Sequence, residues 1–206
     1  MRVSDTEHTS RPWRIHEVTR DFDVEDVWAL QTPGRRDDFR RLVAGLAAGD
    51  PAHGSSPAVR ALWTIRWRLG ALLGWDRPDS GLGGRVPSLR ERLPADLHDS
   101  PGPSFTALPF SPLYLTDDEF AAEIANQTVH GVLHLGWVPD GTGTYQGRMT
   151  VLVKPNGLLG RAYLVVIRPI RHLIVYPLML RRIERQWRTR RGAADPVSAS
   201  RRTWTD

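Results

Sequence analysis

Apolar residues in the second half of the chain recur at the short period that favours β-strands. Four segments share this pattern: residues 113–116, 119–127, 128–138 and 145–154. Asp140-Gly141-Thr142-Gly143 lies between the last two segments, and Asp and Gly at such a position favour a tight hairpin. The pattern predicts an antiparallel sheet with a hairpin between its last two strands.

The first half of the chain is predicted to be mostly helical. Residues 13–18 alternate apolar and polar side chains, as a half-buried strand does. Residues 24–30 are predicted to form a short helix with Asp23 as its N-cap. Apolar side chains three and four residues apart predict a second helix over residues 37–48 and a clearly amphipathic one over residues 58–75.

Pro and Gly mark the connections between these elements. Residues 77–103 are rich in both and predict a long surface connection with one helical turn at residues 88–93. Residues 1–10 are polar and lack the apolar run of a signal peptide, so we expect a flexible arm in a cytoplasmic protein. The prediction is one domain over residues 11–188, with the connection 77–103 as an insertion. A disordered basic tail, residues 189–206, is expected to follow it.

A long segment that turns from apolar to basic, residues 158–187, follows the strands. Pro169 and Pro177 predict that this helix is kinked or broken. Three arginines lie in its apolar part: Arg161, Arg168 and Arg171. Each would oppose insertion into a bilayer by roughly 2.5–3.5 kcal/mol, so a spanning helix is not expected. We expect the helix to pack on the sheet; the alternative is a helix lying in a membrane interface.

Composition adds an asymmetry of charge. The chain has 206 residues, a net charge of +5 and no cysteine, which excludes disulfides, thiol nucleophiles and zinc–thiolate sites. Residues 161–206 hold eleven arginines and three acidic residues, so the rest of the chain is mildly acidic. No nucleic-acid recognition motif accompanies this basic end, and nucleic acid is not an expected partner. The arginines inside the apolar helix instead predict a pocket or a buried ion pair.

Histidines and acids in the predicted strands are the candidates for chemistry. His130 and His134 are four residues apart, which on a strand separates them by roughly 13 Å. One metal ion cannot bind both, so we predict no metal site and no cofactor, and we expect both at the surface or at a sheet edge. The acidic run 117–119 is predicted to be solvated or paired with arginine. Glu123 and Asn126 have apolar neighbours, and a buried carboxylate or amide needs a partner.

Several stretches resemble a known family. They are residues 115–128 (LTDDEFAAEIANQT), 130–137 (HGVLHLGW), 154–163 (KPNGLLGRAY) and 167–172 (IRPIRH). They resemble actinobacterial proteins of domain of unknown function 2867, with similarity over residues 13–187. That family is similar to START-like (SRPBCC) helix-grip proteins. The resemblance implies an α+β fold in which a curved antiparallel sheet wraps around a long C-terminal helix and encloses an apolar cavity.

Binding of a small apolar or amphipathic ligand is the function that this resemblance implies. The expected apolar lining is Trp63, Trp67, Phe120, Ile124, Leu133, Leu135, Tyr163 and Ile167, and the expected polar contacts are Glu123, Asn126 and Arg168. One alternative is an enzyme of the cyclase or hydratase type that uses Glu123 or a histidine as its base. A second alternative is an interaction protein that uses the basic C-terminal face.

Overall fold

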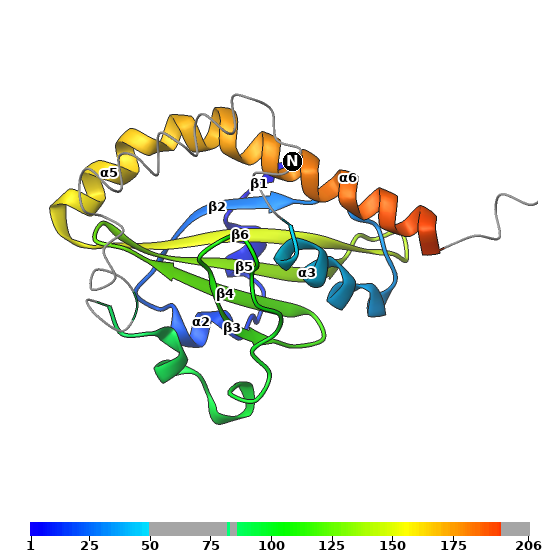
Figure 1. Ribbon diagram of the computed structural model, residues 1–206, viewed down its shortest axis with the longest axis horizontal. Helices are drawn as coiled ribbons and strands as arrows, with labels where there is room; N and C mark the ends of the chain where they lie inside the picture. The colour runs from blue at the N-terminus through cyan, green and yellow to red at the C-terminus, as the bar shows by residue number, and fades with distance from the viewer. Residues whose placement is uncertain (50–81, 83–85, 195–206) are drawn as a thin grey trace, which may run out of the picture.

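The protein has an α+β fold built on one open antiparallel sheet of six strands (Figure 1). The computed structural model describes residues 1–49, 82 and 86–194. The strands are β1 (Arg2–Val3), β2 (Asp23–Ala29), β3 (Ser111–Leu115), β4 (Glu119–Ala125), β5 (Val129–Pro139) and β6 (Tyr145–Pro155). Their order across the sheet is β1-β2-β6-β5-β4-β3. The four predicted strands and the β5–β6 hairpin are therefore confirmed.

Helices and short turns cover both faces of this sheet. One face, called here the helix face, is covered by α3 (Phe39–Ala47), α5 (Gly157–Ile170), the π-helix η5 (Arg171–Val175) and α6 (Tyr176–Ala194). The other, the loop face, is covered by α1 (Thr6–Thr9), α2 (Ile15–Val18), η3 (Leu89–Arg92) and η4 (Ala95–Leu97). A 3-10 turn, η1 (Arg36–Asp38), leads into α3. Since both faces are covered, the central strands are buried on both sides.

The core of the helix face lies under α6. Tyr176, Leu180, Ile183 and Trp187 recur at helical spacing and pack with strand residues such as Leu135. The indole N–H of Trp187 also donates to the Pro33 carbonyl at 3.0 Å, which ties α6 to the segment before α3. For α6, the prediction that the C-terminal helix packs on the sheet is confirmed.

The C-terminal helix is broken, as its prolines predict. Pro169 lies inside α5, the π-helix η5 follows, and Pro177 opens α6. Within the described residues no single helix is long and apolar enough to cross a membrane. Gly157–Leu173 and Tyr176–Arg190 reach that length and composition only together, and they are bent by 46° relative to each other.

Two predicted elements near the N-terminus are wrong. Residues 13–18 form no strand: they contain α2, because the Glu119 carboxylate accepts the backbone N–H groups of Arg14 and Ile15 and so caps the helix from another element. Residues 24–30 form no helix, because β2 pairs between β1 and β6 in the sheet. Pairing with distant strands outweighs the local helical preference in this segment.

Other boundaries also differ from the expectation. Residues 1–10 contain β1 and α1, and α6 continues to Ala194, inside the expected tail. The connection 77–103 is not simply a surface connection, because its described part contributes Leu89, Leu93 and Leu97 to the loop-face core. Its predicted helical turn is confirmed by η3. The predicted helix over residues 58–75 lies outside the described residues.

Gly136 provides a test of the packing on the loop face. A Cβ at Gly136 would lie 2.7 Å from the Trp13 indole, so Gly136→Ala should destabilise the protein by about 1–3 kcal/mol. A Cβ at Gly131, on the same strand, would lie 3.5 Å from Ile124, an ordinary contact, so Gly131→Ala should not destabilise the protein. Urea denaturation of both variants measures the difference, and equal stabilities would contradict this packing.

Candidate functional site

Four buried side chains that can carry charge form two pairs on the loop face. Glu119 and Glu123 are four residues apart on β4, and His130 and His134 are four residues apart on the antiparallel strand β5. Equal spacing on antiparallel neighbours brings them together diagonally. His130 Nε2 lies 2.8 Å from Glu123 Oε2, and His134 Nε2 lies 3.2 Å from Glu119 Oε2.

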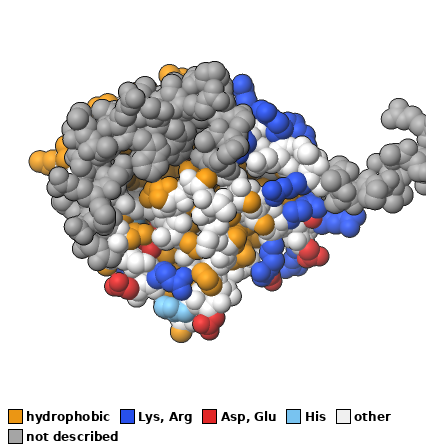
Figure 2. All heavy atoms as spheres, viewed as in Figure 1, with side chains coloured by type: hydrophobic (Ala, Val, Ile, Leu, Met, Phe, Trp, Pro, Cys, Tyr) orange, Lys and Arg blue, Asp and Glu red, His pale blue; other side chains and the backbone are white. Residues whose placement is uncertain are grey.

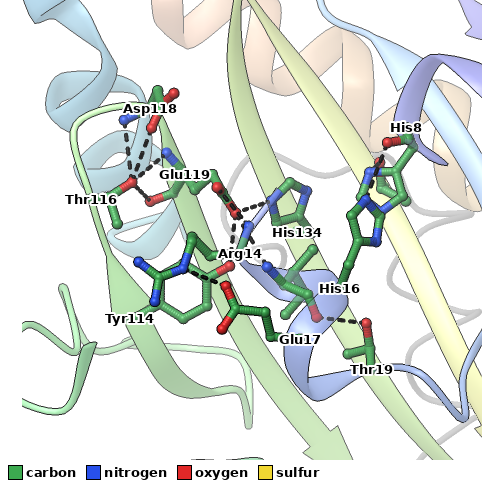
Figure 3. A network of polar contacts seen from close by, with 12 residues as sticks. His8, Arg14, His16, Glu17, Thr19, Tyr114, Thr116, Asp118, Glu119 and His134 are labelled. Carbon is green, nitrogen blue, oxygen red and sulfur yellow. Dashed lines mark hydrogen bonds and ion pairs between the residues drawn. The ribbon is translucent and has the colours of Figure 1, made fainter. Parts of the chain in front are cut away.

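Glu119 collects donors from three separate parts of the chain (Figure 3). Its carboxylate accepts the Arg14 backbone N–H and the Tyr114 hydroxyl, each at 2.9 Å, in addition to the His134 ring. Burial alone would raise the pKa of Glu119, but these donors hold the pKa below its usual value. Burial, together with the neighbouring carboxylate, raises the pKa of the Tyr114 hydroxyl. Glu119 is therefore ionised and Tyr114 neutral.

His134 lies between Glu119 and two further histidines (Figure 3). The ring centroids of His134 and His8 are 5.1 Å apart, and those of His8 and His16 are 4.7 Å apart, both in edge-to-face contact. Burial, and then the neighbouring histidines, lower the pKa of His8 to about 3. Burial also lowers the pKa of His134, although Glu119 opposes it. The His8 and His134 rings are therefore neutral at neutral pH.

Glu123 holds the segment that carries η3 in the same way that Glu119 holds the segment that carries α2. Its carboxylate accepts the Ser88 hydroxyl at 2.5 Å and the Leu89 backbone N–H at 3.0 Å, beside the bond to His130. These donors keep the pKa of Glu123 below its usual value against the effect of burial. The prediction that Glu123 is buried and needs a partner is confirmed.

A carboxylate that orients a neutral imidazole is the arrangement of a general base, but a base must reach its substrate. All four side chains of the Glu–His pairs are buried under α1, α2 and η3. The expectation that His130 and His134 lie at the surface or a sheet edge is wrong, because the loop face is covered as well. No group of three or more His, Asp or Glu side chains in the described part of the chain could hold a metal ion. These pairs fasten the cover to the sheet.

A different polar cluster lies on the helix face, beneath the break in the C-terminal helix. Asp26 on β2 is fully buried, and its carboxylate lies 3.3 Å from Arg171 Nη2 and 3.0 Å from His172 Nε2. Arg2 Nε is 3.3 Å from the other oxygen, and Glu25 pairs with Arg171 at 2.9 Å. The π-helix η5 supplies both Arg171 and His172, so the break in the helix places two basic groups on one buried acid.

Aromatic rings adjoin this cluster. The Tyr176 ring lies 5.3 Å from the Trp28 ring and 5.7 Å from the His172 ring. The Trp28 Nε1 atom is buried but has no hydrogen-bond partner among the residues that the structure describes. A buried donor without an acceptor is costly in a folded protein. We call Trp28, Asp26, Arg171, His172 and Tyr176 the break cluster.

The structure brings some of the predicted site residues together and separates others. Phe120, Leu133 and Leu135 share the helix-face core, while Glu123 lies on the loop face. Ile124 on β4 is half-buried, and so are Tyr163 and Ile167 on α5. Trp63 and Trp67 lie outside the described residues.

The two other predicted polar contacts lie elsewhere. Asn126 Oδ1 accepts the N–H groups of Thr128 and Val129, so this side chain closes the β4–β5 turn. Arg168 and Arg161 are exposed on α5. Of the three arginines predicted to mark a pocket or a buried ion pair, Arg171 is the one that forms an ion pair with another of the described residues.

Sequence reasoning missed most of the break cluster. Arg171 was a candidate because it interrupts an apolar helix, but Asp26 was assigned to a helix and its neighbour Trp28 carried no signal. The matching four-residue spacing of the two acids and the two histidines was a usable signal for the loop-face pairs, because the acids and the histidines lie in two predicted strands that follow each other along the chain. It shows only once both spacings are considered together.

Comparison with protein families found a match that covers most of the chain. A family model described as "Protein of unknown function (DUF2867)" matches residues 18–178. No curated protein and no solved structure matched the chain.

The buried histidines predict a dependence of stability on pH. Below the ordinary histidine pKa of 6.5 the unfolded chain takes up a proton that native His8, with a pKa of about 3, does not bind. The free energy of unfolding should therefore fall as the pH drops from 6.5 towards 3. His8→Gln should remove about 2–3 kcal/mol of the fall between pH 7 and pH 4.5. Chemical denaturation across this range measures it, and identical slopes in both proteins would contradict a neutral native His8.

The break cluster predicts unequal effects of two arginine substitutions. Arg171→Met leaves Asp26 buried with fewer cationic partners and should cost about 2 kcal/mol or more in unfolding free energy. Arg168→Met removes an exposed arginine from the same helical segment and should change stability by about 0.5 kcal/mol or less. Denaturant unfolding compares the two, and an equal loss would show that the Arg171–Asp26 pair does not stabilise the fold.

Proposed function

Because the chain belongs to the DUF2867 family, a family of unknown function, we propose its function from the geometry of the site. We propose that the protein binds a small amphipathic ligand between the sheet and α5, in a helix-grip arrangement like that of START-like proteins. The ligand would have an apolar body and at least one hydrogen-bond acceptor.

The observation that carries this proposal is the Trp28 indole N–H. It is buried without an acceptor among the described residues, on a ring that packs near Tyr176, and the Tyr176 ring in turn lies near Arg171 and His172. The ring of Trp28 also contacts Tyr176, so donor, charge and aromatic surface converge at one place. Small-molecule sites commonly combine an apolar wall with a few convergent polar groups. A ligand oxygen that accepts this N–H would satisfy the orphaned donor.

Half-buried apolar side chains supply such a wall. On the sheet they are Ile124 and Val151, and on α5 they are Tyr163, Leu164 and Ile167. The core under α6, by contrast, consists largely of fully buried side chains. Packing is therefore less complete at the α5 end of the helix face than at the α6 end. This difference supports a ligand beside α5.

The cyclase or hydratase alternative has less support. It needs Glu123 or a histidine to act as a base towards a substrate. Glu123 already accepts three donors, and its lowered pKa makes it a weak base at neutral pH. The two β5 histidines are enclosed with the acids. The geometry favours binding over catalysis by these residues.

Binding of a fluorescent single-chain fatty acid, followed by titration, tests the proposed site. The wild type should bind the probe, and Trp28→Phe should raise the Kd for the probe by about five- to tenfold, as expected for one lost hydrogen bond. Native mass spectrometry of the purified protein should show a co-purified ligand of one predominant mass.

Trp137→Phe is the matched control, because it removes another indole N–H, one that already donates to the Arg35 carbonyl at 3.1 Å. This variant should keep the wild-type Kd for the probe. The proposal fails if the wild type binds neither the probe nor a co-purified ligand, or if both tryptophan variants raise the Kd for the probe equally.

A further inference from the structure

The outer side of α5 is an apolar surface exposed to solvent. Leu158 is 82% exposed, Val165 73% and Val166 70%, and Leu173 in η5 is 77% exposed. Leu159 belongs to the same surface. On a helix, residues 158, 159, 165 and 166 share one side, because they are separated by about two turns. Figure 2 shows hydrophobic side chains projecting from the outer edge of the molecule, where Figure 1 places α5.

Helix α5 is therefore apolar on two sides. Its inner side, with Gly160 buried against the β4–β5 turn and Ile167 half-buried, lies on the sheet. A helix that is hydrophobic all round is normally enclosed on all sides, in a protein core or in lipid. Contiguous exposed apolar patches on proteins mark sites of interaction with proteins or membranes. The outer side of α5 therefore has the character of an interaction surface.

The charges around this surface indicate the kind of partner. Arg161 and Arg168 are exposed on α5, seven residues apart and thus on the same edge of the apolar side. Further along the chain, α6 adds Arg181, Arg185 and Arg188, all exposed. Residues 157–194 contain nine arginines and one acid, Glu184. Figure 2 shows basic side chains gathered where α6 runs.

We propose that the outer side of α5 docks on the surface of an anionic lipid bilayer, with the helix lying in the interface. Interfacial helices insert aliphatic side chains at the boundary of the acyl chains and keep basic side chains at the headgroups. Each arginine near an anionic surface adds to the attraction. Docking of α5 on a bilayer depends neither on the proposed ligand nor on the break cluster.

The segment docks on the bilayer and does not cross it. Arg171 is bound to Asp26 and Glu25 of the folded domain, and Tyr176 and Leu180 of α6 belong to the protein core. Crossing the membrane would break these contacts. The 46° bend between the two helical parts also leaves neither part long enough to span.

A second copy of the chain fits this surface less well than lipid does. Two copies packed through α5 would bring the arginines at its edge close to those of the partner. Within residues 157–170 there is no acidic residue to pair with them. Like charges brought together oppose association, whereas an anionic headgroup layer complements them.

Co-sedimentation with vesicles tests the proposal on the full-length protein. One set of vesicles is phosphatidylcholine alone, and the other contains about one-third phosphatidylglycerol. The wild type should pellet with the anionic vesicles at low salt, bind phosphatidylcholine at least tenfold more weakly, and lose most of its binding at high salt. No pelleting with anionic vesicles at low salt would overturn the proposal.

Two pairs of substitutions separate the apolar and the charged contributions. Val165→Glu with Val166→Glu, at exposed positions, should keep the fold and reduce vesicle binding about tenfold or more. Arg161→Gln with Arg168→Gln should reduce binding to anionic vesicles and lower its salt dependence. Arg36→Gln with Arg40→Gln makes the same charge change at exposed positions near α3 and should bind like the wild type.

Three results contradict the proposal. In the first, the Val165/Val166 variant pellets like the wild type. In the second, the Arg36/Arg40 control loses as much binding as the Arg161/Arg168 variant. In the third, sedimentation equilibrium shows a wild-type dimer that the Val165/Val166 variant abolishes, which would assign this surface to a second copy. Thermal unfolding of each variant verifies that a loss of vesicle binding does not come from a loss of fold.

Discussion

Two buried carboxylates of β4, Glu119 at the start of the strand and Glu123 further along it, constrain much of this structure. Moving a charged carboxylate out of water costs several kcal/mol unless hydrogen-bond donors replace the water. Glu119 and Glu123 obtain those donors from the ring nitrogens of β5 and from backbone N–H groups of two segments far away in sequence. The segments that carry α2 and η3 have little regular structure of their own. Their position over the sheet follows from the need to satisfy these acids.

This constraint divides the two faces of the sheet by role. On the loop face the two acids are paired with histidines and enclosed under the covering segments, although His8 Nε2 and His134 Nδ1 have no hydrogen-bond partner among the described residues. On the helix face the buried acid Asp26 is paired with residues of η5, the part of the C-terminal helix that departs from regular α-helical geometry. The ion pairs of η5 hold the C-terminal helix against the sheet at the break. On one side of the break α6 is well packed, and on the other side α5 is not. Entry and release of a ligand are therefore expected at the α5 end of the helix face.

The sequence was sufficient to predict the elements whose partners are close along the chain. Strands β3 to β6 follow one another as hairpins, so local alternation and turn residues identify them, and Pro169 and Pro177 locate the break in the helix. Prediction failed for residues 13–30, where the deciding contacts are distant: Glu119 caps α2, and β6 pairs with β2. The burial of His130 and His134 was missed for a related reason, since an alternating strand does not reveal that a loop covers its polar side. The break cluster joins β2 to η5 and could not be predicted while β2 was assigned to a helix.

The exposed side of α5 is difficult to explain as part of a domain that is complete in isolation. A buried Val or Leu side chain contributes roughly 1.5–3 kcal/mol, and an ordinary domain is stable by only about 5–15 kcal/mol. Leaving Leu158, Val165 and Val166 in water forgoes a contribution comparable to the whole stability of a domain. Arg161 and Arg168 on the same helix prevent a simple buried position, because each would then need an acid, and α5 contains none. A membrane interface, with apolar acyl chains and anionic headgroups, provides a partner for both the apolar side chains and the arginines. The ion pair of Arg171 with Asp26 limits how far the helix can leave the sheet to reach that interface.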